Sequence, residues 1–466
     1  MKELLLKILK ENNINHSQFA RDLDISRAYV VSMLKGTKPL TEKIYNRLIT
    51  LNYISGKDKE DISNEYFKVK HSAKTLELIK CFLDLGKDFT FEPVSNVTAD
   101  FPADLTEKAV TLDKDGIIKT ACSLLNTALQ ENLSFCTNYS FCLEELDNAL
   151  YAYYKNKYNP DCPLFDHVIT LPEELDRESI ISYWKCLKWG SLRAVTSVIV
   201  SQQQNNILPY YIVCKNAVLI FSEDMSKGTA FISPEIAQYY IQQHMKISET
   251  AHKGITIIHD ESELLTGQDF VSPKYIKSLS TYICPMNVLD YDMLYRTTAE
   301  NPEPIKDALI NAYINYYGRT KALNILYVYY TNDALENFMK TGLLYNVSEK
   351  YLHEFSVEDR VRVLKNIVDN GMFSLMKSGT ADFYRGYDAS VTDKSLITHF
   401  ALTYPGHTDY EIYMCVDKSK YHGAEDFTKA LFEYIEMDNH ICSREQAGFV
   451  ISQLQAMGGI YDSTAN

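Results

Sequence analysis

The segment NHSQFARDLDISRAYVVSMLKG, residues 15–36, joins two short helical patterns across a break of only a few residues. Each pattern has apolar residues on one face: Phe19, Ala20 and Leu23 in the first, and Val30, Met33 and Leu34 in the second. Asp24 stands where the chain must turn sharply, and its short polar side chain tolerates left-handed backbone angles. Ser26 fits the N-cap of the second helix, and Gly36 fits a left-handed cap at its end. The segment therefore predicts two helices crossing at a tight turn.

Two further helical patterns flank this pair. Residues 2–12 repeat leucine and isoleucine on one stripe with lysines elsewhere, and Thr41 can cap another helix that continues to about Leu51. Together the patterns predict an all-α head of four to five helices in residues 1–52.

The charge of the chain is unevenly distributed. The net charge is −14, but residues 1–50 carry nine Lys or Arg and five Asp or Glu, a net of +4, which leaves −18 for the remainder. An acidic chain of this kind does not coat nucleic acid over its whole surface. A small basic head on a large acidic body instead indicates that an anionic partner would bind the head.

The pattern SQFARDLDISRAYVVSMLKGTKPL resembles the helix-turn-helix of the Cro/C1-type (Xre-type) family of lambda Cro and lambda repressor. The resemblance covers residues 1–51, and it implies that the head binds double-stranded DNA. It departs from the family at His16, where glutamine is frequent, and at Asp24, where glycine is usual. A histidine can still donate a hydrogen bond to a phosphate.

The outward face of the second helix of the pair contains the candidate DNA-reading residues. Arg27 can make a bidentate contact to guanine, Ala28 can touch a thymine methyl group, and Ser32 can bond to either base type. The other candidates flank this face and suit phosphate contacts. The complete predicted set is His16, Ser17, Ser26, Arg27, Ala28, Tyr29, Ser32, Lys35, Thr37 and Lys38. The alternative for the same residues is a small helical bundle that docks on protein.

The remaining chain predicts a multidomain protein with a large, mainly α, mixed α+β body. Charged and weakly patterned residues predict a linker, and alternating β-branched runs after Leu208 predict strands. The predicted regions are a linker at 53–74, a helical region at 75–207, an α/β sensor-like region at 208–300, and a mainly helical region at 301–466 that can include a short sheet. The strands of 208–260 and the tyrosine-rich residues near 313–330 are candidates for an effector pocket.

The sequence carries no recognisable catalytic or metal-binding motif. P-loop, GxSxG and HExxH patterns are missing, so we expect no enzyme and no cofactor. The ten cysteines include no CxxC pair, which predicts no metal site and a reducing, cytoplasmic location. The opening MKELLLKILK does not read as a signal peptide, and no uncharged apolar run reaches the roughly 18 residues that span a bilayer, so no membrane partner is expected.

These features predict a sequence-specific transcriptional regulator that acts as a homodimer on a double-stranded DNA operator. Its acidic body would oligomerise and bind an unidentified small-molecule or peptide effector. Two alternatives stay open: a peptide-sensing regulator with a helical-repeat body, and an enzyme or toxin-system component whose head only autoregulates its own promoter.

Overall fold

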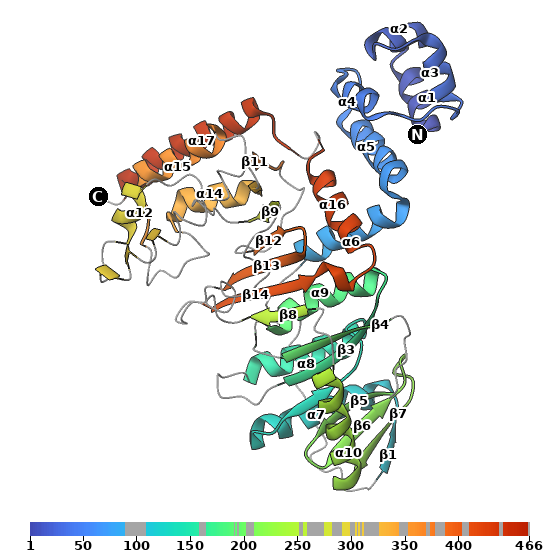
Figure 1. Ribbon diagram of the computed structural model, residues 1–466, viewed down its shortest axis with the longest axis vertical. Helices are drawn as coiled ribbons and strands as arrows, with labels where there is room; N and C mark the ends of the chain where they lie inside the picture. Colours follow the sequence, from blue (N-terminus) through green and yellow to red (C-terminus); the bar gives the residue numbers. More distant parts are fainter. Residues whose placement is uncertain are drawn as a thin grey trace.

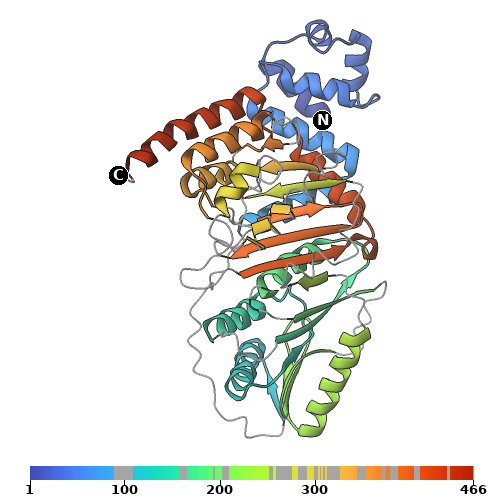
Figure 2. The same cartoon turned by 60° about the vertical axis from the view of Figure 1, so that its left-hand side comes forward.

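The structure is a computed structural model that describes most of the chain. The described residues are 1–88, 109–157, 165–190, 192, 195–201, 209–250, 255–258, 275–281, 291–298, 303–304, 306–307, 310–311, 326–343, 353–369, 373–377, 387–402, 410–437 and 441–464. A run of N-terminal helices forms a head at one end of the molecule, and a larger body with two sheets follows (Figures 1 and 2). The predicted multidomain fold class, an all-α head followed by a mixed body, is confirmed.

The head has its own hydrophobic core, which is separate from the cores of the body. Its helices are α1 (Lys2–Glu11), α2 (His16–Asp22), α3 (Arg27–Leu34), α4 (Glu42–Thr50) and α5 (Gly56–His71). The first four agree with the expected helices to within a residue or two.

Helix α5 occupies most of the segment 53–74 that was predicted to be a linker. Ser55 caps it, its Oγ accepting from the Asp58 N–H at 3.1 Å. Tyr66 stacks on Tyr45 of α4 with ring centroids 4.3 Å apart, and the Tyr45 hydroxyl bonds to Ser63 at 2.9 Å. The sequence concealed this helix because its buried residues are sparse and partly polar. The connection from the head is therefore a packed helix rather than a loose tether.

The C-terminal end of α5 docks on α16 (Ala424–Ile435) of the body. Phe67 meets Tyr434 edge to face at 5.4 Å. Glu433 pairs with Lys70 at 2.7 Å and accepts from His71 Nε2 at 2.8 Å. Since one helix contacts both α4 and α16, it joins the head directly to the body.

We expect Glu433→Gln to loosen this junction by on the order of 0.5–1 kcal/mol, because the partners are partly exposed. Burial acts to raise the pKa of Glu433, but the hydrogen bonds and charges of Lys70 and His71 outweigh it and hold the pKa below its usual value. A lowered pKa stabilises the junction above the unfolded pKa of about 4.3, and this stabilisation is lost as the pH falls through the folded pKa.

The rate of amide hydrogen exchange in α5 tests this prediction. Exchange in the wild-type protein should increase at acidic pH after correction for the intrinsic rate, whereas the variant should exchange faster at neutral pH and respond less to acid. Equal protection of α5 in both proteins at neutral pH would contradict the role of Glu433.

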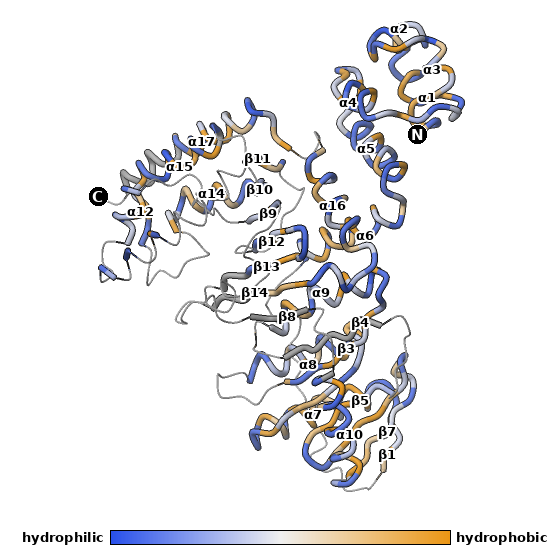
Figure 3. The backbone as a smooth tube through the Cα atoms, viewed as in Figure 1, coloured by the Kyte–Doolittle hydropathy of each residue, from blue (hydrophilic) through white to orange (hydrophobic). Residues whose placement is uncertain are grey.

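The part of the body nearer in sequence to the head contains a seven-stranded sheet of order β1-β7-β6-β5-β2-β3-β4. Its strands are β1 (Ala109–Leu112), β2 (Phe135–Thr137), β3 (Phe165–Pro172), β4 (Val195–Ser201), β5 (Tyr210–Cys214), β6 (Ala217–Phe221) and β7 (Gly228–Ile232). The helices of this part are α6 (Ala73–Lys87), α7 (Lys114–Glu131), α8 (Glu144–Lys157), α9 (Arg177–Gly190) and α10 (Pro234–Thr250). The central strands β5 and β6 run through a strongly hydrophobic part of the chain (Figure 3).

The second seven-stranded sheet has the order β11-β10-β9-β12-β13-β14-β8. Its strands are β8 (Ile255–Ile258), β9 (Ile276–Ser280), β10 (Leu326–Tyr330), β11 (Phe373–Leu375), β12 (Tyr387–Val391), β13 (Ser395–Leu402) and β14 (Tyr410–Asp417). Around it lie α12 (Tyr291–Thr297), α14 (Asn332–Thr341), α15 (Val357–Asp369), η3 (Lys418–Lys420), α16 and α17 (Arg444–Thr464).

The two sheets share one topology. Read from β8, the second sheet runs β8-β14-β13-β12-β9-β10-β11, which matches the first strand for strand. In each sheet the three strands at the β4 or β11 edge are parallel, and the remaining pairs are antiparallel. A helix follows the last strand of each set, α10 after β7 and α16 after β14. The body is therefore built from two structural repeats of one α/β fold.

This architecture changes several sequence-based expectations. The region 75–207, predicted to be helical, supplies β1 to β4, and the mainly helical region 301–466 supplies β10 to β14. Within the first of these regions, α9 ends at Gly190 and the strand β4 follows it. Because the two repeats are α/β units, the described body is not a helical-repeat array, and the helical-repeat body of that alternative is wrong. The expected strand–turn–strand pattern after Leu208 is confirmed in β5, β6 and β7.

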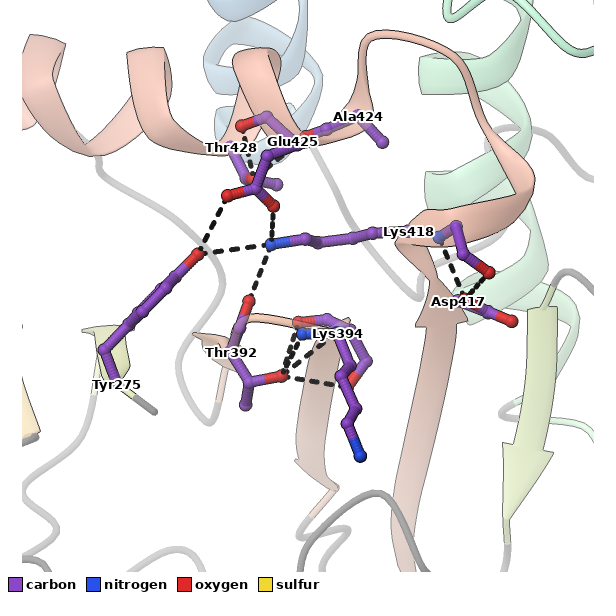
Figure 4. A network of polar contacts seen from close by, with 10 residues as sticks. Tyr275, Thr392, Lys394, Asp417, Lys418, Ala424, Glu425 and Thr428 are labelled. Carbon is purple, nitrogen blue, oxygen red and sulfur yellow. Dashed lines mark hydrogen bonds and ion pairs between the residues drawn. The ribbon is translucent and has the colours of Figure 1, made fainter. Parts of the chain in front are cut away.

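A buried lysine fixes α16 to the second sheet (Figure 4). Lys418 is 6% exposed, and its Nζ donates to the Thr392 carbonyl at 2.6 Å and to the Tyr275 hydroxyl at 3.3 Å. The ammonium also pairs with Glu425 on α16, and the Tyr275 hydroxyl donates to the same carboxylate at 3.3 Å. The same helix that holds α5 is thus anchored by charge to the end of β14.

An apolar cavity of about 50 Å³ lies beside this anchor, between α6, α9, α16 and the strands β13 and β14. A space of that size accommodates one or two water molecules and no larger effector. Much of the tyrosine-rich stretch near 313–330, a predicted pocket candidate, lies outside the described residues. Among the described helices, none is long and apolar enough to cross a membrane.

Candidate nucleic-acid interface

Local backbone signals set the crossing of α2 and α3. Asn15 caps α2, Oδ1 accepting from the Ser17 and Gln18 N–H groups at 3.0 and 2.9 Å. Asp24 adopts a left-handed conformation with φ 51°, as its position predicted. The Ser26 Oγ then accepts from the Tyr29 N–H at 3.1 Å and starts α3. Polar caps on both sides of one left-handed residue give the compact turn between the helices.

The inner face of α3 is buried and fixes which residues face outward. Val30, Met33 and Leu34 are 0%, 3% and 5% exposed, as expected. Arg27 and Ala28 are exposed on the opposite side, and Ser32 is half-buried. The Arg27 guanidinium makes no hydrogen bond or ion pair with any residue that the structure describes. It is a charged, bidentate donor at the N-terminal end of an exposed helix face.

The loop after α3 folds back onto the helix and uses some of the predicted phosphate donors. The Tyr29 hydroxyl donates to the Pro39 carbonyl at 3.1 Å, and the Thr37 hydroxyl donates to the Ser32 carbonyl at 2.9 Å. Lys38 Nζ lies 4.6 Å from the centre of the Tyr29 ring. Both hydroxyl protons are therefore engaged, and their role is to shape the loop. The cations of Lys38 and the exposed Lys35 retain donors that can bind phosphate.

Two of the predicted DNA-contacting side chains lie at the start of α2. His16 is half-buried and Ser17 is exposed at this end of the helix. The Ser17 and Gln18 N–H groups already bond to Asn15, so they are not available to a phosphate. Sequence reasoning overlooked this cap, although asparagine before a helix is a common capping residue.

Arg47 of α4 was also missed, and it lies against the turn. Its guanidinium donates to the Leu23 carbonyl at 3.0 Å and pairs with Asp24 at 2.6 Å. The hydrogen bond and positive charge of Arg47 lower the pKa of the Asp24 carboxyl. The pair offsets a negative charge beside the candidate interface. Its two members are 23 positions apart in the sequence, so no local pattern indicates the contact.

The left-handed angle at Asp24 can be tested with two substitutions. Asp24→Gly and Asp24→Ala both remove the ion pair, but only alanine carries a Cβ that is strained at positive φ. We expect the glycine variant of the head to melt roughly 4–8 °C above the alanine variant. Thermal unfolding followed by circular dichroism measures the difference. Equal melting temperatures would mean that this backbone angle is not a stability constraint.

Comparisons with known proteins do not assign this interface. No family model and no curated protein matches the chain. Among solved structures, a similar one is TrmBL2, described as an archaeal chromatin protein with a novel mode of DNA binding. It is 14% identical, the match covers 49% of this chain and 82% of TrmBL2, and the TM-score is 0.24. Overlap at that level does not establish a common fold.

Proposed function

We propose that this chain is a sequence-specific DNA-binding transcriptional regulator of the cytoplasm, with a head similar to the Cro/C1-type. The observation that carries the proposal is the exposed face of α3. Arg27 lies there without a hydrogen-bond or ion-pair partner among the residues that the structure describes, and Lys35 and Lys38 flank it. A short helix with its first turn directed outward suits the major groove, where base edges are distinguishable. Arg27 would read guanine, and the lysines would bind phosphates.

The acidic body limits how DNA can approach. The net charge of −18 after residue 50 would repel DNA phosphates at close range. Helix α5 packs against α1 and α4, away from the exposed face of α3, which supports an approach of DNA from the side opposite the body. The exposed residues of α3 can therefore contact a DNA duplex without any movement of the body.

We further propose that two copies bind together. One head makes few contacts, whereas two heads about 34–36 Å apart reach successive major grooves on one side of the duplex. The body would hold the two heads at that spacing. An effector, whether a small molecule or a peptide, would act by changing the angle of α5 on the body, and it must bind the two arrangements with different affinity.

The same proposal treats the chain as a non-enzyme that needs no cofactor for DNA binding. The head supplies the partner contacts, and the body supplies assembly and regulation. An enzyme that carries an autoregulatory head is the competing possibility, and it would show turnover of a substrate in addition to DNA binding.

Selection of bound duplexes from a random pool by the full chain tests the proposal. We expect enrichment of a sequence with two inverted half-sites whose centres are separated by one helical turn or a multiple of it. The bound chain should also protect both half-sites of the selected duplex from nuclease cleavage. A pool that shows no enrichment after repeated rounds, at a salt concentration where the chain still binds DNA, would overturn the sequence-specific function.

A further inference from the structure

Three side chains that are far apart in the sequence converge on one face of the first sheet. Cys136 of β2 and Asp166 of β3 are direct neighbours in the parallel register of those strands. His244 comes from α10, which covers this face. One ligand atom from each residue lies within 4.8 Å of the others. The sheet register and the covering helix thus assemble a thiol, a carboxyl and an imidazole.

The imidazole and the carboxyl lack ordinary hydrogen-bond partners at this point. His244 is 0% exposed, and its Nε2 lies 3.2 Å from Asp166 Oδ1. Even so, neither atom has an aligned hydrogen-bond partner among the described residues. Leaving buried polar groups unsatisfied is costly, so native proteins rarely do it. Two such atoms beside a thiol indicate a shared ligand.

The other ring nitrogen of His244 is already oriented. Its Nδ1 lies 2.8 Å from the Tyr211 hydroxyl on β5. If Nδ1 carries the proton and donates a hydrogen bond to the Tyr211 oxygen, the lone pair of Nε2 is directed into the cluster. Metal-binding histidines in general use their second nitrogen in this way.

The arrangement does not suit a cysteine nucleophile. In a Cys–His–Asp relay the thiol and the carboxyl contact opposite nitrogens of the ring. Here the carboxyl lies at Nε2, and Tyr211 occupies Nδ1. Burial and the nearby Asp166 also raise the pKa of the Cys136 thiol to about 12, which disfavours a free thiolate at neutral pH.

We propose that Cys136, Asp166 and His244 bind a zinc ion. Thiolate, imidazole and carboxylate together match the ligands that Zn²⁺ accepts, whereas Mg²⁺ and Ca²⁺ select oxygen alone. Bond lengths of about 2.0–2.3 Å place tetrahedral ligands roughly 3.3–3.8 Å apart, so the cluster needs only small side-chain adjustments. The two anionic ligands balance the charge of the ion.

The described residues supply three protein ligands to this site, which is the number that zinc sites with an open position have. The Asp166 side chain is 28% exposed, so the fourth position can hold water. Zinc binds the thiolate, so binding displaces the thiol proton of Cys136. The ion would also tie α10 to β2 and β3, and it would raise the melting temperature by binding the folded state.

Zinc and cobalt titrations of the full, untagged chain test the site. We expect one Zn²⁺ per chain in competition with a chelator, and Co²⁺ should produce an absorption band for charge transfer from thiolate to metal. The affinity for Zn²⁺ should fall at least tenfold in each of Cys136→Ala, His244→Gln and Asp166→Asn. It should fall about 10–100-fold in Tyr211→Phe. The cobalt band should vanish in Cys136→Ala.

A matched control is available on the neighbouring strand. Cys214 of β5 is also buried, but it packs into the core on the opposite face of the same sheet. Cys214→Ala should bind Zn²⁺ and Co²⁺ like the wild-type protein. Unchanged Zn²⁺ affinity in Cys136→Ala, or in Asp166→Asn with a native circular dichroism spectrum, would overturn the proposal. A full chain that binds no Zn²⁺, or a Co²⁺ complex without the thiolate band, would also overturn it.

Discussion

Arg27→Ala is expected to lose sequence preference at one base pair in each half-site, at a cost of about 1–3 kcal/mol per half-site. Arg27 is an exposed arginine at the N-terminal end of α3, and it has no internal partner among the described residues. Because the substitution removes a bidentate donor and no packing, the fold of the head should be unaffected. The affinity for duplexes that carry each of the four base pairs in turn at every position identifies the position at which preference is lost.

Lys35→Ala is the matched control for that experiment. Lys35 is exposed at the other end of α3, and it makes no ion pair with a described residue, whereas Lys38 also packs on Tyr29. We expect Lys35→Ala to weaken all duplexes alike and to reduce the salt dependence by about one phosphate contact per head. If Arg27→Ala also weakened every sequence equally, α3 would not read bases in the proposed orientation.

A fragment of residues 1–72 is expected to bind a two-site operator about 10²–10⁴-fold more weakly than the full chain. Two linked heads bind the second half-site at a high effective concentration, and an isolated head loses this advantage without losing any contact. The fragment should fold, because the head core is separate and includes Ile54 and Ile62 near and within α5. Anisotropy titrations with one operator, together with the mass of each species by ultracentrifugation, measure the effect.

The choice of residue 72 follows from the structure. A fragment that stopped at residue 52 would remove α5, which supplies Tyr66 to the stack on Tyr45. Circular dichroism should confirm that the longer fragment is helical before its affinity is compared. Should that folded fragment bind as tightly as the full chain, the body would have no part in pairing the heads.

The sequence by itself determined much of the head. Asp24, Ser26 and Gly36 act through the backbone of their nearest neighbours, so their roles could be predicted without a fold. Helix caps in the body act through the same local contacts. Ser356 caps α15 through the Asp359 N–H at 3.1 Å, and Gly342 ends α14 in a left-handed conformation with φ 67°. The exposed side of α3 likewise followed from the spacing of its buried residues.

Only the tertiary structure decided the organisation of the body. Strands β2 and β3 are short or lie next to helical patterns, and they become strands because β4 and β5 pair with them. The repeat of one topology is visible in strand order and not in residue identity, because many sequences can fill the same apolar positions. Cys136, Asp166 and His244 meet through sheet register and helix packing, which join residues 30 to 108 positions apart. Local spacing cannot report such contacts, since they depend on which distant segments the folded chain brings together.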